Sequence, residues 1–218
     1  RAVHGAAPAG IASSATIANP GDLAEARVGR PFRVVTGSGA PSGRRILYFM
    51  SPALVDEASG VRGSYLHLAS RVAADLVGAG LQTLVFAQSR RAVEIVLRYV
   101  RDAVMRSGLT PEAVQGYRGG YLPSLRRSIE DGLKRGAIRC VAATNALELG
   151  VDIGSLDAVV LAGFPGTIAS TWQRLGRAGR STGPSVAVRV GSASPLDQFV
   201  IRHPEWLAET APERGLVD

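Results

Sequence analysis

Short apolar runs alternate with longer amphipathic stretches between residues 45 and 190, and this alternation restricts the fold more than any other feature of the 218-residue chain. Apolar runs bounded by turn residues predict buried strands, and apolar residues at helical spacing predict helices between them. Strands that alternate with helices indicate crossover connections in a parallel sheet. The sequence therefore predicts an α/β fold, a doubly wound and mostly parallel sheet with helices on both faces. We expect strands at residues 46–50, 81–87, 113–117, 138–143, 156–161 and 185–190, and helices at 65–77, 90–106, 168–177 and from residue 123 onward.

The carboxyl ends of these strands are where a functional site is expected. In open sheets of this kind, ligands bind in the crevice beyond the strand ends. The segments that follow Ala87, Tyr117, Ala143 and Leu161 are therefore the first places to look for chemistry.

The first 44 residues have a different character, because they are rich in Gly, Pro, Ala and Ser. Their patterns predict only a short helix at 22–27 and a short strand at 32–35. We interpret residues 1–44 as the end of one unit with a linker, 45–193 as the main domain, and 194–218 as the start of a further region. Because the sequence begins with Arg1 and not Met, we expect an internal part of a longer protein.

Composition narrows the classes of partner. The chain has 25 basic and 18 acidic residues and a net charge of +7, which favours a polyanionic partner. Lys134 is its one lysine and lies in Leu-Lys-Arg, so the sequence contains no phosphate-binding Gly-Lys-Ser/Thr loop. No uncharged apolar run approaches the roughly 18 residues of a membrane span, and no membrane partner is expected.

The chain has too few cysteines and histidines for a fold held together by disulfides or by structural metal ions. Cys140 is the single cysteine, so it cannot form an intramolecular disulfide, and with its position inside a predicted strand we expect an inert buried thiol. The three histidines lack the spacing of a structural zinc site, and we predict no metal site. The predicted compartment is the cytosol.

Two segments carry the strongest chemical signals. Residues 173–180 read Gln-Arg-Leu-Gly-Arg-Ala-Gly-Arg, and the small glycines let the guanidinium groups of Arg177 and Arg180 approach a phosphate closely. Residues 144–154 read Thr-Asn-Ala-Leu-Glu-Leu-Gly-Val-Asp-Ile-Gly and follow a predicted strand. There Thr144 offers a hydroxyl and backbone N–H groups to an anion. The register of the first segment argues against an ordinary exposed basic helix end.

These two segments resemble motifs V and VI of the superfamily 2 helicases, the ATP-driven nucleic-acid motors. Ser-Ala-Thr at residues 14–16 resembles motif III, which ends the first motor lobe, and residues 84–90 resemble motif IV. Ser-Ala-Thr-Ile-Ala-Asn-Pro, Leu-Glu-Leu-Gly-Val-Asp-Ile-Gly and Trp-Gln-Arg-Leu-Gly-Arg-Ala-Gly-Arg are most similar to the DEAD/DEAH-box branch of the bacterial mitomycin-repair helicases and their fungal RecQ-type relatives. The resemblance implies a second, C-terminal RecA-like lobe.

The resemblance also implies roles for single residues. Arg177 and Arg180 correspond to arginine fingers that reach ATP across the cleft between the lobes, and Gln173 helps to order the phosphate site. The family places its P-loop and Asp-Glu box upstream of motif III, so ATP and Mg²⁺ are bound mainly by the first lobe. The 218-residue chain alone is therefore expected to be inactive. Gly150 and Asp152 are expected to approach the nucleotide.

A second group of residues is implied to face nucleic acid or the first lobe. Single-strand phosphate contacts suit hydroxyls, backbone N–H groups and arginines at loop starts, which follow the backbone without reading bases. The implied partners are a single strand, DNA by preference, and the first lobe of the same protein. The residues are Thr144, Ser89, Arg90, Arg118 and Arg126 for the strand, and Ser14 and Thr16 for coupling between the lobes.

Two alternatives remain open at this stage. An RNA helicase of the DEAD-box group is disfavoured, because Gln173 stands where that group has His and Leu149 stands where it has Arg. A regulatory module that binds nucleic acid without catalysis is disfavoured because Arg177 and Arg180 are both retained. The preferred prediction is half of a DNA-repair motor.

Overall fold

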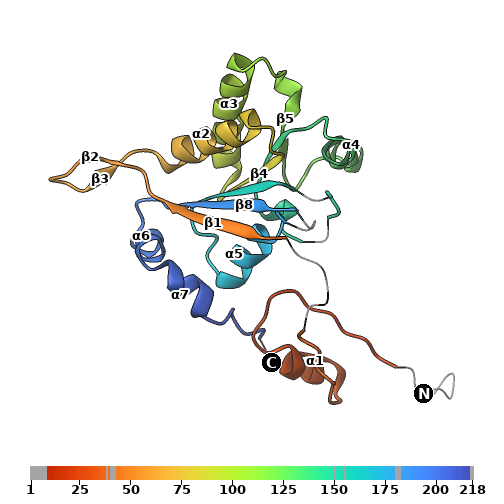
Figure 1. Cartoon of the computed structure of the whole chain (residues 1–218). Helices are drawn as coiled ribbons and strands as arrows, with labels where there is room; N and C mark the ends of the chain where they lie inside the picture. Colours follow the sequence, from red (N-terminus) through yellow and green to blue (C-terminus); the bar gives the residue numbers. More distant parts are fainter. Residues whose placement is uncertain are drawn as a thin grey trace.

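The computed structural model of the chain describes residues 9–37, 39, 43–149, 151–154, 156–179 and 183–216 (Figure 1). Within them lies a six-stranded sheet in the order β1-β8-β7-β4-β6-β5, with every neighbouring pair parallel. This confirms the predicted doubly wound α/β fold. The strands are β1 Arg45–Met50, β4 Thr83–Ala87, β5 Val114–Tyr117, β6 Cys140–Ala143, β7 Ala158–Ala162 and β8 Ser185–Val190, and a separate hairpin pairs β2 Leu54–Asp56 with β3 Val61–Arg62.

The helices cover both faces of the sheet, as Figure 1 shows. Two of them, α2 and α3, pack together on one face, whereas α4, α5 and the C-terminal helices lie on the other side of the strands. The helices are α1 Pro20–Val28, α2 Tyr65–Gly78, α3 Arg90–Arg106, α4 Pro123–Lys134, α5 Ile168–Leu175, α6 Pro195–Arg202 and α7 Pro204–Glu209, with 3-10 turns η1 Pro111–Ala113 and η2 Asn145–Leu147.

Alternation along the strands sorts their side chains between two cores. Val85 and Ala87 of β4 join the core beneath α2 and α3, while Leu84 and Phe86 join the core beneath α4 and α5. This follows from the two-residue period of a strand. Because both faces are covered, the central strands read as continuous apolar runs in the sequence.

The predicted elements agree with the structure except in three regions. Residues 32–35 form no strand, so that prediction was wrong; Val34 and Val35 are exposed and meet no neighbouring strand there. The hairpin β2–β3 and helices α6 and α7 were not predicted. The bounds of several elements also differ from the prediction. Strands β4, β6 and β7 each begin two residues later than predicted, and α5 ends at Leu175 and not at residue 177.

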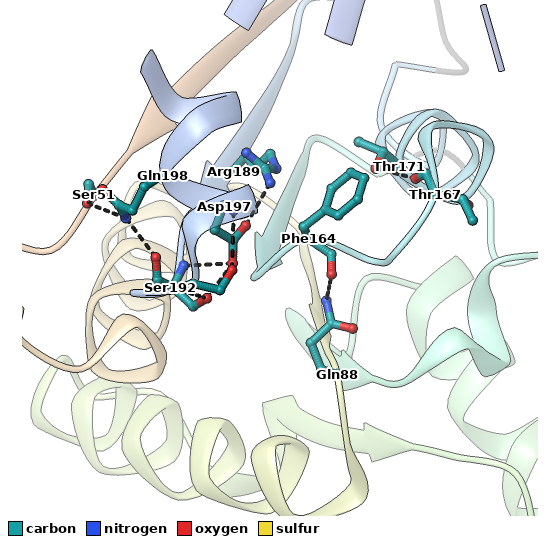
Figure 2. A network of polar contacts seen from close by, with 10 residues as sticks. Ser51, Gln88, Phe164, Thr167, Thr171, Arg189, Ser192, Asp197 and Gln198 are labelled. Carbon is teal, nitrogen blue, oxygen red and sulfur yellow. Dashed lines mark hydrogen bonds and ion pairs between the residues drawn. The ribbon is translucent and has the colours of Figure 1, made fainter. Parts of the chain in front are cut away.

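Helix α6 is attached to the sheet by a buried ion pair, shown in Figure 2. Arg189 of β8 is fully buried, and its Nη2 donates to Asp197 Oδ1 of α6 over 2.7 Å. The other carboxylate oxygen of Asp197 accepts from the backbone N–H of Ser192 over 2.9 Å. The guanidinium of Arg189 also lies 5.2 Å from the centroid of the Phe164 ring. Charge, and not only apolar packing, therefore fixes α6.

Candidate nucleotide and nucleic-acid site

The carboxyl ends of the parallel strands bring several predicted residues to one edge of the sheet. Ser89 and Arg90 follow β4, and Thr144 follows β6, which pairs directly with β4. Ser89 and Arg90 are exposed and Thr144 is half-buried. The structure thus brings together three of the residues predicted to contact strand phosphates, at the edge where ligands bind in such sheets.

Ser89 caps a helix in the structure, in addition to its predicted contact with strand phosphates. Its Oγ accepts a hydrogen bond from the backbone N–H of Ala92 over 3.1 Å and so caps the N-terminus of α3. A hydroxyl that accepts in this way keeps its own proton to donate. Ser89 can therefore cap the helix and donate to a phosphate oxygen at the same time.

Arg174 and Arg177 hold the segment after β6 against the end of α5. Arg174 is buried, its Nε donates to Glu148 Oε2 over 2.8 Å, and its guanidinium lies 5.3 Å from the centroid of the Phe86 ring. Arg177 is 3% exposed and donates from Nε to Glu148 O over 3.1 Å and from Nη1 to Val151 O over 2.8 Å. The helicase-like segments at 144–154 and 173–180 are therefore joined through buried guanidinium groups.

The turn after α5 depends on a glycine. Gly179 has φ +75°, and a Cβ built on it would lie 2.4 Å from Ser185 Oγ. Any other residue would be strained at this φ, and its Cβ would also displace the Ser185 hydroxyl. Arg45 Nη2 donates to Ala178 O over 2.8 Å at the same turn, so the edge strand β1 also supports it. The backbone leading to residue 180 is thereby fixed from two sides.

The residues predicted to face the nucleotide differ in burial and in contacts, and two of them lie outside the described residues. Gln173 is half-buried near the end of α5, and Arg177 directs its guanidinium along the 148–151 segment. Gly150 and Arg180 lie outside the described residues. Asp152 is exposed, and its Oδ2 accepts from Lys134 Nζ over 2.8 Å. This hydrogen bond raises the pKa of Lys134 above its ordinary value.

Arg118 directly follows β5, the edge strand that pairs with β6, whereas Arg126 lies on α4. Arg118 forms an ion pair with Glu94 of α3 at 3.1 Å and lies 5.2 Å from the centroid of the Tyr121 ring. Arg126 is exposed on α4, beside a hydrogen bond of 2.7 Å from Tyr117 Oη to Glu130. Desolvation and this hydrogen bond raise the pKa of Tyr117 to about 12. The structure does not bring these two arginines into contact with Ser89 or Thr144 through any hydrogen bond among the described residues.

Ser14 and Thr16 lie apart from the sheet, in the segment before α1. Ser14 is exposed and Thr16 is half-buried, and both line an open hollow bounded by α1 and residues 32–36. Just after this segment, Ala18 and Asn19 form hydrogen bonds with residues 213 and 215 of the C-terminal tail. The role of Ser14 and Thr16 in coupling the lobes stays a prediction.

Three further observations concern metal binding, membrane spans and the one cysteine. The described residues contain no cluster of three or more His, Cys, Asp or Glu side chains suited to a metal ion. None of the described helices is long and apolar enough to cross a membrane. Cys140 is fully buried, and desolvation raises its pKa to about 12, as expected for an inert thiol.

Comparison with known proteins decides the family. The model of the helicase conserved C-terminal domain matches residues 66–182, which is more than half of the chain. The chain belongs to this family. The matched region contains the segments at 84–90, 144–154 and 173–180, and it confirms the C-terminal RecA-like lobe that these motifs predicted.

The relatives place the chain on one branch of superfamily 2. It is 44% identical over 215 residues to the uncharacterized ATP-dependent helicase YprA of Bacillus subtilis, covering 99% of this chain and 29% of that protein. It is 36% identical over 203 residues to the ATP-dependent helicase HRQ1 of Saccharomyces cerevisiae, covering 91% of this chain and 19% of that protein. The chain therefore spans less than a third of the length of these relatives, on the predicted branch.

Solved structures agree with this placement. The DUF1998 helicase MrfA bound to DNA has a TM-score of 0.90 and 45% identity, covering 94% of this chain and 27% of that one. The Mycobacterium smegmatis helicase Lhr bound to ssDNA and AMP-PNP has a TM-score of 0.74 and 30% identity, covering 94% and 27%. A DEAD-box protein from Methanococcus jannaschii, at 18% identity and a TM-score of 0.53, shares the fold.

Several residues that hold the site were not predicted from the sequence. Arg174 and Glu148 both lie inside the recognised motifs, so their helical and loop positions could have suggested the pair. Glu213, whose carboxylate accepts from the first turn of α5, had no local signal. A contact between residues 45 positions apart is set by the fold and not by a motif.

Proposed function

We propose that this chain is the second motor lobe of an ATP-dependent DNA helicase or translocase that acts in repair. The observation that carries the proposal is the buried link from Arg174 and Arg177 to Glu148 and Val151. It joins the segment that begins at Thr144, which we assign to strand binding, to residues 173–180, the arginine segment, which we assign to the nucleotide side. A displacement at either end is therefore passed to the other, which is what an ATP-driven motor requires.

On the nucleotide side, ATP and Mg²⁺ are held mainly by the first lobe. The residues here do not suit a complete nucleotide site, because the one lysine, Lys134, contacts Asp152 and lies in no phosphate-binding loop. Arginines can instead stabilise the charge that develops on a transferring phosphoryl group. We assign this role to Arg177 and Arg180, with Gln173 ordering the phosphate site and Gly150 and Asp152 near the nucleotide.

On the strand side, Thr144, Ser89 and Arg90 form the centre of the contact, with Arg118 and Arg126 at its border. A hydroxyl, a capped helix N-terminus and an exposed guanidinium suit phosphate oxygens without reading bases. The ion pair of Arg118 with Glu94 has to be shared or broken for Arg118 to contact a phosphate. DNA is the preferred strand, because Gln173 departs from the DEAD-box pattern and the relative MrfA was solved with DNA.

The arginine assignment predicts a large kinetic effect in the full-length protein. Arg180→Ala removes charge stabilisation from the transition state and should lower nucleic-acid-stimulated ATPase turnover by about 10³-fold. Arg202→Ala removes the same charge from an exposed position at the end of α6 and should leave turnover within about twofold. Phosphate release measured at saturating DNA decides between them. Near-normal turnover in Arg180→Ala would show that motif VI is wrongly assigned.

The strand assignment predicts a change in salt dependence. Each phosphate neutralised on a single strand contributes roughly −0.7 to the slope of log K against log salt. Arg90→Ala combined with Thr144→Ala should flatten the slope by roughly 0.7 and weaken binding without sequence preference. Labelled DNA and RNA oligonucleotides titrated at several salt concentrations test both the site and the choice of strand. Arg71→Ala, at an exposed position of α2, is the matched charge control.

A further inference from the structure

The C-terminal tail contacts two parts of the lobe that are far apart in sequence. Figure 1 shows the chain returning from α7 to lie beside α1, at the bottom of the view. Residues 213–215, which we call the tail clasp, make hydrogen bonds both to the segment at the start of α1 and to the start of α5. The clasp therefore joins the region just after residues 14–16 to the helix that leads into the arginine segment.

On the α1 side, the contacts are several and specific. Asn19 is buried and exchanges two hydrogen bonds with Gly215, from Nδ2 to the carbonyl over 3.1 Å and from the Gly215 N–H to Oδ1 over 2.6 Å. Ala18 N donates to Glu213 O over 3.2 Å. Leu23 packs directly on Gly215, where an added Cβ would meet its Cδ2 at 2.8 Å. This half of the clasp is a fitted contact and not a loose tail.

On the α5 side, a single carboxylate satisfies two helix donors. Glu213 accepts from Ile168 N over 2.7 Å and from Ala169 N over 2.9 Å, while Thr167 Oγ1 accepts from Ser170 N over 3.0 Å. The N–H groups of a first helical turn have no partner within the helix, and a negative charge there is favourable. Trp172 Nε1 also donates to Leu207 O of α7 over 3.2 Å. The C-terminal segment thus holds α5 at its start and at its middle.

We infer that the tail clasp sets the orientation of α5 relative to the segment at 14–19, and that Glu213 is a positioning residue for the arginine segment. This inference rests on the proposed function of the lobe. Because α5 is eight residues long and runs straight into Gly176 and Arg177, a tilt at its start displaces the guanidinium groups at its end. Misplacement of a catalytic group by a remote change can cost up to about 10²-fold in rate.

The test uses three variants of the full-length protein. Glu213→Ala removes both acceptors, and Glu213→Gln keeps one oxygen. Gly215→Ala disturbs the α1 side and leaves the carboxylate in place. Glu209→Ala is the control, since Glu209 is exposed on α7 and its carboxylate has no hydrogen bond or ion pair among the described residues. Amide exchange at Ile168 and Ala169 is measured together with kcat and KM for ATP.

Glu213→Ala should speed exchange of both amides by about tenfold and lower kcat about three- to tenfold, with KM for ATP within about twofold, since the first lobe binds the nucleotide ground state. Glu213→Gln should give a smaller effect in both measurements. Gly215→Ala should raise exchange at Ile168 and Ala169 although its change lies on the α1 side. Glu209→Ala should resemble the parent protein.

Two results would overturn the inference. Unchanged exchange in Glu213→Ala would mean that the clasp does not form, and faster exchange with unchanged kcat would reduce Glu213 to an ordinary helix cap. Arg180→Ala in the same assay separates this from the proposed function. If Arg180→Ala abolishes turnover and Glu213→Ala does not lower it, the inference about the tail clasp is wrong and the proposed function stands. If neither variant lowers turnover, the proposed function is wrong.

Discussion

The two faces of the sheet are built in different ways. Beneath α2 and α3 the contacts are almost wholly apolar, as with Val96, Val100 and Cys140, each of which is fully buried. Beneath α5 and α6 the core includes buried arginines, among them Arg174, with Glu148, and Arg189, with Asp197. One face is packed, and the other is also ionically linked.

The difference shows what each construction supplies. Apolar burial contributes stability without direction, at roughly 25 cal/mol per Å². Buried ion pairs contribute little net stability, but removal of one partner destabilises the fold strongly. Their geometry also fixes how the two segments that carry them are aligned. The face that carries the 144–154 and 173–180 segments uses the second device. We interpret the charges as fixing the orientation of these two segments, which the proposed motor function would require.

The largest effect should come from breaking the ionic face. Asp197→Ala leaves Arg189 as an uncompensated buried charge and should lower the free energy of unfolding by about 3–5 kcal/mol. Urea unfolding of the chain measures it, with Asp75→Ala, an exposed carboxylate of α2, as control. The double variant Arg189→Met with Asp197→Leu should recover most of the loss. A cost below about 1 kcal/mol for Asp197→Ala would remove the contrast between the faces.

A somewhat smaller effect should follow from truncation on the apolar face. Leu97 of α3 is 4% exposed, and Leu97→Ala should cost about 2–4 kcal/mol through lost burial and the cavity left behind. ATPase turnover per folded molecule in the full-length protein should stay within about twofold, because Leu97 packs in the core beneath α2 and α3, whereas Leu175 at the end of α5 packs in the core of the opposite face. Urea unfolding measures the loss of stability, and turnover normalised to the amount of folded protein tests whether activity is unchanged. A large fall in kcat would show that the apolar face also transmits position.

The smallest effect is expected at Cys140. Burial raises its pKa to about 12, so almost no thiolate exists at pH 8 and an alkylating reagent should leave it unmodified in the folded chain. Mass spectrometry before and after addition of denaturant measures the labelling. Rapid modification under native conditions would mean that the core beneath α2 and α3 opens readily, and that the contrast of the faces is dynamic as well as chemical.

Much of the fold could be predicted because its central strands are covered on both faces. Continuous apolar runs such as 158–162 and the amphipathic period of α3 carry their own signals. The failed strand at 32–35 shows the limit, because Val34 and Val35 satisfy strand propensity but find no neighbouring strand. Propensity alone does not supply a partner.

The site could be predicted in part for a related reason. Thr144, Ser89 and Arg90 follow strands, so topology places them at one edge. The partners of Arg177 are the backbone carbonyls of residues 148 and 151. Because every residue has a backbone carbonyl, the sequence gives no signal for these contacts. The sequence likewise did not indicate that Asp152 contacts Lys134, since this pair joins two separate segments across 18 positions.

The tail clasp also has a consequence for the order in which the lobe is completed during translation. Asn19 and Gly215 are 196 positions apart, and β1 pairs with β8, so both contacts wait for late parts of the chain. At roughly 5–20 residues per second, about 10–40 s separate the synthesis of Asn19 from that of Gly215. The α2–α3 face and the central strands can form first, β8 then docks beside β1, and the clasp closes last. On the ribosome, the arginine segment therefore exists before the contact that orients its helix.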